Sequence, residues 1–151
     1  MIKIICVGKL KEKYWTEAVN EYLKRLSKYT KIELIELNDS KIDDPRIALK
    51  QEKELILSKI SDKDYIITLE IDGKSLTSIE LAKKIDNLTS QHSNLCFIIG
   101  GSNGIHEEIR NKSSLKLSFS SLTFPHQLFR VMFLEQLYRA YKINNNESYH
   151  K

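Results

Sequence analysis

The glycine-rich segment Gly100–Gly104 is the first place where the sequence offers chemistry. It directly follows the apolar run Leu95–Ile99, and glycines after a strand let the main chain approach a nucleotide or nucleoside closely. The spacing is GGxxG after the fourth predicted strand, whereas a nicotinamide-binding fingerprint is GxGxxG after the first strand. The segment therefore indicates either a different ligand-binding loop or an ordinary tight turn.

A second glycine motif, Gly73-Lys74-Ser75, has the ending of a phosphate-binding P-loop. That motif also needs a glycine five residues earlier, where Thr68 stands, so the P-loop interpretation fails. Asp72-Gly73 instead predicts a turn that ends the preceding strand.

The histidines and cysteines give no recognisable metal or nucleophile motif. None of the four histidines is spaced with another as a metal pair, and Cys6 and Cys96 lie inside apolar runs. We predict buried, reduced thiols and no bound metal. The polar C-terminal tail Asn144–Lys151 is, on composition alone, a solvated segment.

Three lysines, Lys9, Lys11 and Lys13, follow the first predicted strand, with Tyr14 and Trp15 next to them. They suit contacts with phosphate groups, but a solvated helix entrance explains them equally well. The formal net charge is only +4, which permits an anionic partner without requiring one.

The elements that must position these residues alternate between strands and helices. With 151 residues, we expect a single α/β domain with a mostly parallel sheet flanked by helices, whose ligands bind beyond the carboxyl ends of the strands. The predicted strands are Ile2–Val7, Lys31–Leu37, Tyr65–Ile71, Leu95–Ile99 and Leu115–Phe119. The predicted helices are Tyr14–Tyr29, Pro45 to about Ile60, a capping-box helix from Thr77 to about Leu88, His106–Asn111, and Pro125 to about Ile143.

The last predicted helix is apolar around its whole circumference between Leu128 and Tyr141. Such a helix is buried on every side, so in a small protein either a second subunit covers part of it or it is the central helix of the core, and we expect the second subunit. Glu135 and Arg139 are spaced i,i+4 and can pair. No apolar run is long enough to span a membrane or act as a signal peptide, so we expect a cytoplasmic protein with no membrane contact.

Five ordered stretches carry a family resemblance over essentially the whole chain. They are Val7–Trp15, Ile67–Lys74, Phe97–Gly104, Leu117–Gln127 and Glu135–Ala140 with the ending Tyr149-His150-Lys151. Together they resemble the ribosomal RNA large subunit methyltransferase H family of SPOUT-class enzymes.

The resemblance implies a fold, a reaction and a cofactor. It implies a C-terminal trefoil knot, a homodimer, and transfer of a methyl group from S-adenosylmethionine to N3 of a pseudouridine in large-subunit rRNA. Without the resemblance a knot would not be expected, because knots are very rare. The implied cofactor-binding residues are Leu69, Gly100, Phe119, Ser120, Ser121, Leu122, Thr123 and Phe124.

For catalysis we expect four polar residues near the C-terminus to act on the base. His150 is the expected general base, Arg139 favours the N3 anion or binds phosphate, Tyr149 stacks on or hydrogen-bonds the base, and Glu135 orients Arg139. Because the net charge is small, we expect the substrate to be rRNA in the assembled ribosome. A non-catalytic RNA-binding module and a nicotinamide oxidoreductase are the two alternatives.

Overall fold

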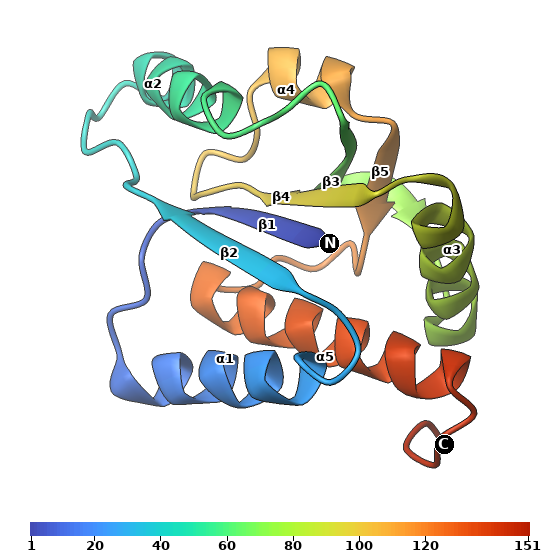
Figure 1. Cartoon of the computed structure of the whole chain (residues 1–151). Helices are drawn as coiled ribbons and strands as arrows, with labels where there is room; N and C mark the ends of the chain where they lie inside the picture. Colours follow the sequence, from blue (N-terminus) through green and yellow to red (C-terminus); the bar gives the residue numbers. More distant parts are fainter.

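The computed structural model describes residues 1–151, which form a three-layer α/β/α arrangement around one sheet (Figure 1). The strands are β1 (Ile2–Val7), β2 (Ile32–Leu37), β3 (Asp64–Ser75), β4 (Asn94–Ile99) and β5 (Leu115–Ser118). The helices are α1 (Lys13–Leu26), α2 (Pro45–Leu57), α3 (Ser78–Gln91), α4 (Glu107–Lys112) and α5 (His126–Asn144).

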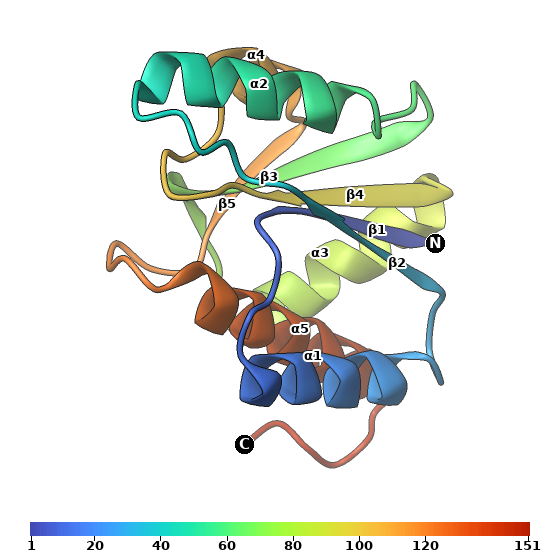
Figure 2. The ribbon, with the colours of Figure 1, turned by 90° about the vertical axis from the view of Figure 1, so that its left-hand side faces the viewer.

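The sheet has the strand order β2-β1-β4-β3-β5, and every neighbouring pair of strands is parallel. The expected α/β fold is therefore confirmed, with a sheet that is wholly rather than mostly parallel. Helices α1, α3 and α5 cover one face, and α2 and α4 cover the other (Figure 2). None of the helices has the length and apolar character needed to cross a bilayer.

Two hydrophobic clusters fill the space between the layers. The larger lies between the sheet and α1, α3 and α5, and includes Phe97 on β4 and Phe133 on α5, whose ring centroids are 4.8 Å apart. The smaller lies beneath α2 and α4. Cys6 and Cys96 are buried as free thiols, as predicted, and burial raises the pKa of each thiol to about 12.

The predicted helix starts are confirmed by their caps. Asp44 accepts a hydrogen bond from Arg46 N at the start of α2, next to Pro45. Thr77 and Glu80 form the reciprocal capping box at the start of α3.

The prediction that Asp72-Gly73 is a turn ending the third strand is wrong. β3 continues to Ser75 and pairs with β5 again after an irregularity between Leu69 and Lys74. A Cβ on Gly73 would lie 2.6 Å from the Leu117 carbonyl carbon, so only glycine allows this close approach of β3 to β5. Pairing with β5 thus overrides the turn preference of the Asp-Gly dipeptide.

Candidate functional site

A cavity of about 370 Å³ lies at the edge of the sheet where β4 and β5 end and where β3 continues beyond its last pair with β4. Its walls come mainly from the middle of β3 and from the segments that follow β4 and β5, at the left in Figure 2. We call it the edge cavity. Its lining comprises Leu69–Asp72, Ile99–Ile105, Arg110, Phe119, Ser120, Leu122–Phe124, His126 and Phe129. The sheet thus places its ligand-sized opening where parallel α/β sheets bind ligands.

Seven of the eight predicted cofactor-binding residues line the edge cavity. Leu69 is the last β3 residue paired with β4, and Gly100 directly follows β4, while Phe119, Ser120, Leu122, Thr123 and Phe124 come from the segment between β5 and α5. Ser121 belongs to the same segment but does not line the cavity. The structure therefore brings these residues together, and their binding role stays a prediction.

Gly100 is needed for a reason internal to its loop. A Cβ at this position would lie 2.5 Å from the Gly104 carbonyl oxygen and 2.8 Å from Ile105 Cγ1. The loop closes on itself through a hydrogen bond from Gly104 N to Gly101 O of 3.0 Å, and Gly104 has a φ of +79°. Gly100 and Gly104 thus allow the tight loop that forms one wall of the edge cavity.

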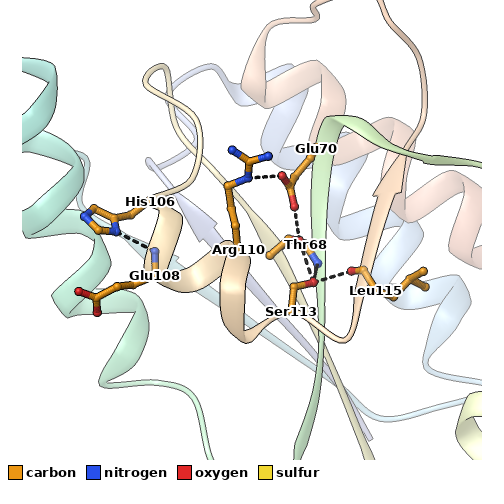
Figure 3. Close-up of polar contacts among 7 residues, drawn as sticks. All are labelled: Thr68, Glu70, His106, Glu108, Arg110, Ser113 and Leu115. Carbon is orange, nitrogen blue, oxygen red and sulfur yellow. Dashed lines mark hydrogen bonds and ion pairs between the residues drawn. The ribbon is translucent and has the colours of Figure 1, made fainter.

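A polar network that the sequence analysis missed fixes a carboxylate in the cavity wall (Figure 3). The Thr68 hydroxyl donates to Glu70 Oε2, and Arg110 Nε donates to Glu70 Oε1. Ser113 accepts from Thr68 N at 3.3 Å and donates to Leu115 O at 2.6 Å, which ties β3 to the start of β5. Only 8% of the Glu70 side chain is exposed.

The same network orients a cation at the cavity. Arg110 Nη1 and Nη2 make no hydrogen bond within the chain, and 42% of the side chain is exposed. A guanidinium held through Nε keeps its outer fork free for a carboxylate or phosphate group. Thr68 and Glu70 are two residues apart on β3 and therefore point to the same face of the sheet. This spacing was the sequence signal that could have revealed the carboxylate in the network.

Two histidines lie near this network. His106 caps α4, with Nδ1 accepting from Glu108 N at 3.0 Å (Figure 3). His126, the first residue of α5, lines the edge cavity itself. No group of three or more His, Cys, Asp or Glu side chains is arranged to hold a metal ion.

The four residues expected to act in catalysis form one cluster at the C-terminal end, which we call the C-terminal cluster. Glu135 and Arg139 make the expected i,i+4 ion pair at 2.6 Å, and Tyr149 donates to Glu135 Oε1 at 3.1 Å. The Arg139 guanidinium also lies over the Tyr149 ring, 4.9 Å from its centroid, and Arg139 Nη1 is 3.1 Å from His150 Nδ1.

Electrostatics fixes the protonation of this cluster. The hydrogen bond to Glu135 raises the pKa of Arg139, so the guanidinium keeps its positive charge. Burial, followed by the hydrogen bond to Glu135, raises the pKa of Tyr149 to about 12, so its phenol is neutral. Because a guanidinium only donates hydrogen bonds, Nδ1 of His150 is the acceptor from Arg139, and a neutral ring then carries its proton on Nε2.

The C-terminal cluster and the edge cavity are separate within one chain. None of the four cluster residues lines the edge cavity. Glu135 instead lines a second cavity of about 420 Å³ between α3, α5 and β5, and Phe119 and Phe124 line both cavities. A reaction that uses both the C-terminal cluster and the edge cavity therefore needs contacts beyond those within a single chain to bring the two together.

Comparison with known proteins gives the class to which this fold and site belong. The family model described as "Predicted SPOUT methyltransferase" matches residues 1–150. The chain therefore belongs to the SPOUT methyltransferase family.

Similar proteins refine this result. The chain is 52% identical to a protein of Clostridium botulinum (strain Alaska E43 / Type E3) and 50% identical to one of Clostridioides difficile (strain 630). Each match covers 99% of both chains, and both proteins are named "Ribosomal RNA large subunit methyltransferase H". A probable methylase family protein from Haemophilus influenzae Rd KW20 has a similar fold, with a TM-score of 0.58 at 15% identity over 99% of this chain and 70% of that one.

Proposed function

We propose that this protein transfers a methyl group from S-adenosylmethionine to N3 of a pseudouridine in the large-subunit rRNA of assembled ribosomes. The observation that carries the proposal is the edge cavity, formed by β3 and the segments after β4 and β5, in a chain that is 50–52% identical to proteins named as rRNA methyltransferases. Family membership supports the methyl transfer, and the names of the relatives support the RNA substrate.

The residues of the edge cavity suit the proposed cofactor. The volume of about 370 Å³ lies in the range of small-molecule sites. Leu69, Phe119 and Phe124 offer an apolar wall to an adenosine ring, and main-chain groups of the segment after β5 can pair with its polar edge. The free fork of Arg110 fits a carboxylate, which the amino-acid end of S-adenosylmethionine carries. When bound, this cofactor supplies an electrophilic methyl group on a sulfonium ion.

The C-terminal cluster suits the removal of a proton from the target base. For His150 to accept the N3 proton at Nδ1, Arg139 Nη1 must leave that atom, and the freed guanidinium can then stabilise the N3 anion. Glu135 holds the other side of the guanidinium, and neutral Tyr149 offers a ring and a hydroxyl to the base. The chain's own residues thus provide an acceptor for the proton and a cation for the resulting charge.

We infer that the active protein is a homodimer in which the tail of one chain serves the edge cavity of the other. Within one chain the C-terminal cluster does not line that cavity. In a dimer, the C-terminal cluster of the second chain would lie at the cavity instead. Several apolar side chains of α5 are only partly buried, including Val131, Met132 and Tyr138, and a partner chain would cover their remaining exposed surface. The C-terminal knot and the cytoplasmic location belong to the same proposal.

Methyl transfer tests the proposed function directly. The purified protein is incubated with methyl-labelled S-adenosylmethionine and ribosomes, or with naked rRNA, and the labelled nucleoside is identified. We expect label on N3 of one pseudouridine in the large-subunit rRNA of ribosomes, and none when uridine replaces that pseudouridine. Binding of RNA without any methyl transfer would instead establish the non-catalytic RNA-binding alternative.

A further inference from the structure

A short basic segment, Lys9–Lys13, joins β1 to α1 and has exposed positive charge without a function in the proposed site. It contains three lysines and one glutamate in five residues, and all three lysine side chains are exposed. Lys9 and Lys11 have no acidic partner, and Lys13 makes only a 3.7 Å contact with Glu17. Such a solvated contact contributes little, so these positive charges remain available to an anionic partner.

A buried ion pair fixes the course of the chain into this segment. Arg130 on α5 is 1% exposed, and its Nη1 donates to Glu36 Oε2 at 2.7 Å while Nη2 donates to Gly8 O at 2.9 Å. The same Glu36 oxygen accepts from Leu10 N at 3.0 Å. Nε of Arg130 is buried without a partner, so the charge depends on the two contacts of Nη1 and Nη2. Because an unpaired buried cation is costly, these contacts favour one position of the main chain from Gly8 to Leu10.

A second contact sets the basic segment against the start of α5. Lys11 N donates to Gln127 Oε1 at 2.9 Å, and the preceding residue, His126, lines the edge cavity. Figure 2 shows the segment between β1 and α1 passing the start of α5. A phosphate group bound at Lys11 would therefore lie near the start of α5, where His126 lines the edge cavity.

We propose that Lys9, Lys11 and Lys13 form a phosphate-binding strip that guides the substrate RNA to the edge cavity. This inference rests on the proposed function, because it names the surface that holds the RNA during methyl transfer. Lysines bind phosphates without reading sequence, which suits a strip that positions the RNA while another part of the protein selects the base. Tyr14 follows the strip, is 61% exposed and packs edge-on against Trp15 with centroids 5.0 Å apart, so it offers a ring to an unstacked base.

Two triple variants with the same change in charge test the strip. The first carries Lys9→Gln, Lys11→Gln and Lys13→Gln. The matched control carries Lys50→Gln, Lys59→Gln and Lys63→Gln, which replace three exposed lysines that have no acidic partner and lie in α2 or between α2 and β3. Binding to isolated large ribosomal subunits is measured for each variant between 50 and 200 mM salt, together with affinity for S-adenosylhomocysteine and solution mass.

For the first variant we expect the slope of log affinity against log salt to become shallower by about 2, at roughly 0.7 for each of three phosphate contacts. Over a fourfold change in salt this corresponds to about a 16-fold change in the ratio of wild-type to variant affinity. The control variant should keep the wild-type slope, and all three proteins should bind S-adenosylhomocysteine equally.

Equal slopes for the two triple variants would overturn the inference, and so would a fall in the solution mass of the first variant, which would make the segment a subunit interface. Failure of the proposed function has a different signature. In that case the wild-type protein transfers no methyl group, while the binding measurements still decide whether the strip holds RNA.

Discussion

Replacing Gly100 by alanine tests whether the tight loop after β4 forms the wall of a cofactor site. The added Cβ would lie 2.5 Å from the Gly104 carbonyl oxygen and 2.8 Å from the Gly104 carbonyl carbon. These are main-chain atoms, so no side-chain rotation relieves the clash, and the loop itself must move. Because Gly100 and Gly104 both line the edge cavity, that movement changes the cavity's shape.

The size of the effect follows from the cost of overpacking. Inserting one methyl group into a well-packed site typically costs about 1–3 kcal/mol. If the loop relaxes in the free protein, cofactor binding must restore its position, and the affinity falls by about 5- to 150-fold, at 1.4 kcal/mol per factor of ten. If the loop does not relax, the same cost appears as a melting temperature lower by about 2–4 °C per kcal/mol.

Gly101→Ala is the matched control within the same loop. Its Cβ would meet only side-chain atoms, the nearest being Val7 Cγ1 at 3.0 Å, so a shift of a few tenths of an ångström relieves the contact. The assay is calorimetric titration with S-adenosylhomocysteine alongside thermal unfolding. Two results would show that the tight loop after β4 is not a wall of the cofactor site. Gly100→Ala could retain both the wild-type affinity and the wild-type melting temperature, or Gly101→Ala could be affected more strongly than Gly100→Ala.

Three further substitutions test the Glu135–Arg139 pair, the Glu36–Arg130 pair and the proposed carboxylate contact of Arg110 one at a time. Glu135→Gln removes the charge that holds Arg139, so methyl transfer should fall more than tenfold while calorimetric affinity for S-adenosylhomocysteine stays constant; a matching loss of affinity would contradict the assigned role. Glu36→Leu leaves the buried Arg130 charge unpaired and should lower the free energy of unfolding in denaturant titrations by about 3–5 kcal/mol, whereas Glu36→Gln keeps an acceptor and should cost less; equal losses would refute this. Arg110→Gln should weaken S-adenosylhomocysteine binding about tenfold and leave 5′-methylthioadenosine, which lacks the carboxylate, unaffected; equal effects on both ligands would exclude the carboxylate contact.

The position of the edge cavity was predictable because it depends on local patterns. Apolar runs located the strands, and in a parallel sheet the segments after neighbouring strands meet at one edge. Gly100 and Phe119 follow β4 and β5, and Leu69 is the last β3 residue paired with β4, so the fold class was enough to predict that the three residues converge. The order of the strands, with β4 between β1 and β3, was not needed for that step.

The side-chain networks were harder to predict because they join residues that are distant in the chain. Arg110 meets Glu70 across 40 positions, and Arg130 meets Glu36 across 94. No spacing rule covers such pairs, since they depend on strand order and side-chain rotamers. The spacing of Thr68 and Glu70, two residues apart on one face of β3, was the only sequence signal that could have suggested one of these networks.

The C-terminal cluster was predictable in part. The i,i+4 spacing of Glu135 and Arg139 indicated their ion pair, but the return of the tail over α5 was not visible in the sequence. The tail turns at Asn146, which has a φ of +55°, and Glu147 N bonds to Lys142 O at 2.9 Å. This turn carries the last residues back to Glu135.

The proposed function depends on one site, in which β3 and the segments after β4 and β5 together bind S-adenosylmethionine. A crystal structure of the protein with S-adenosylhomocysteine tests it most directly. We expect the ligand to occupy the edge cavity, with its adenosine against Leu69, Gly100 and the segment from Phe119 to Phe124. A ligand bound in the second cavity, or anywhere else on the chain, would show that the proposed cofactor site is wrong.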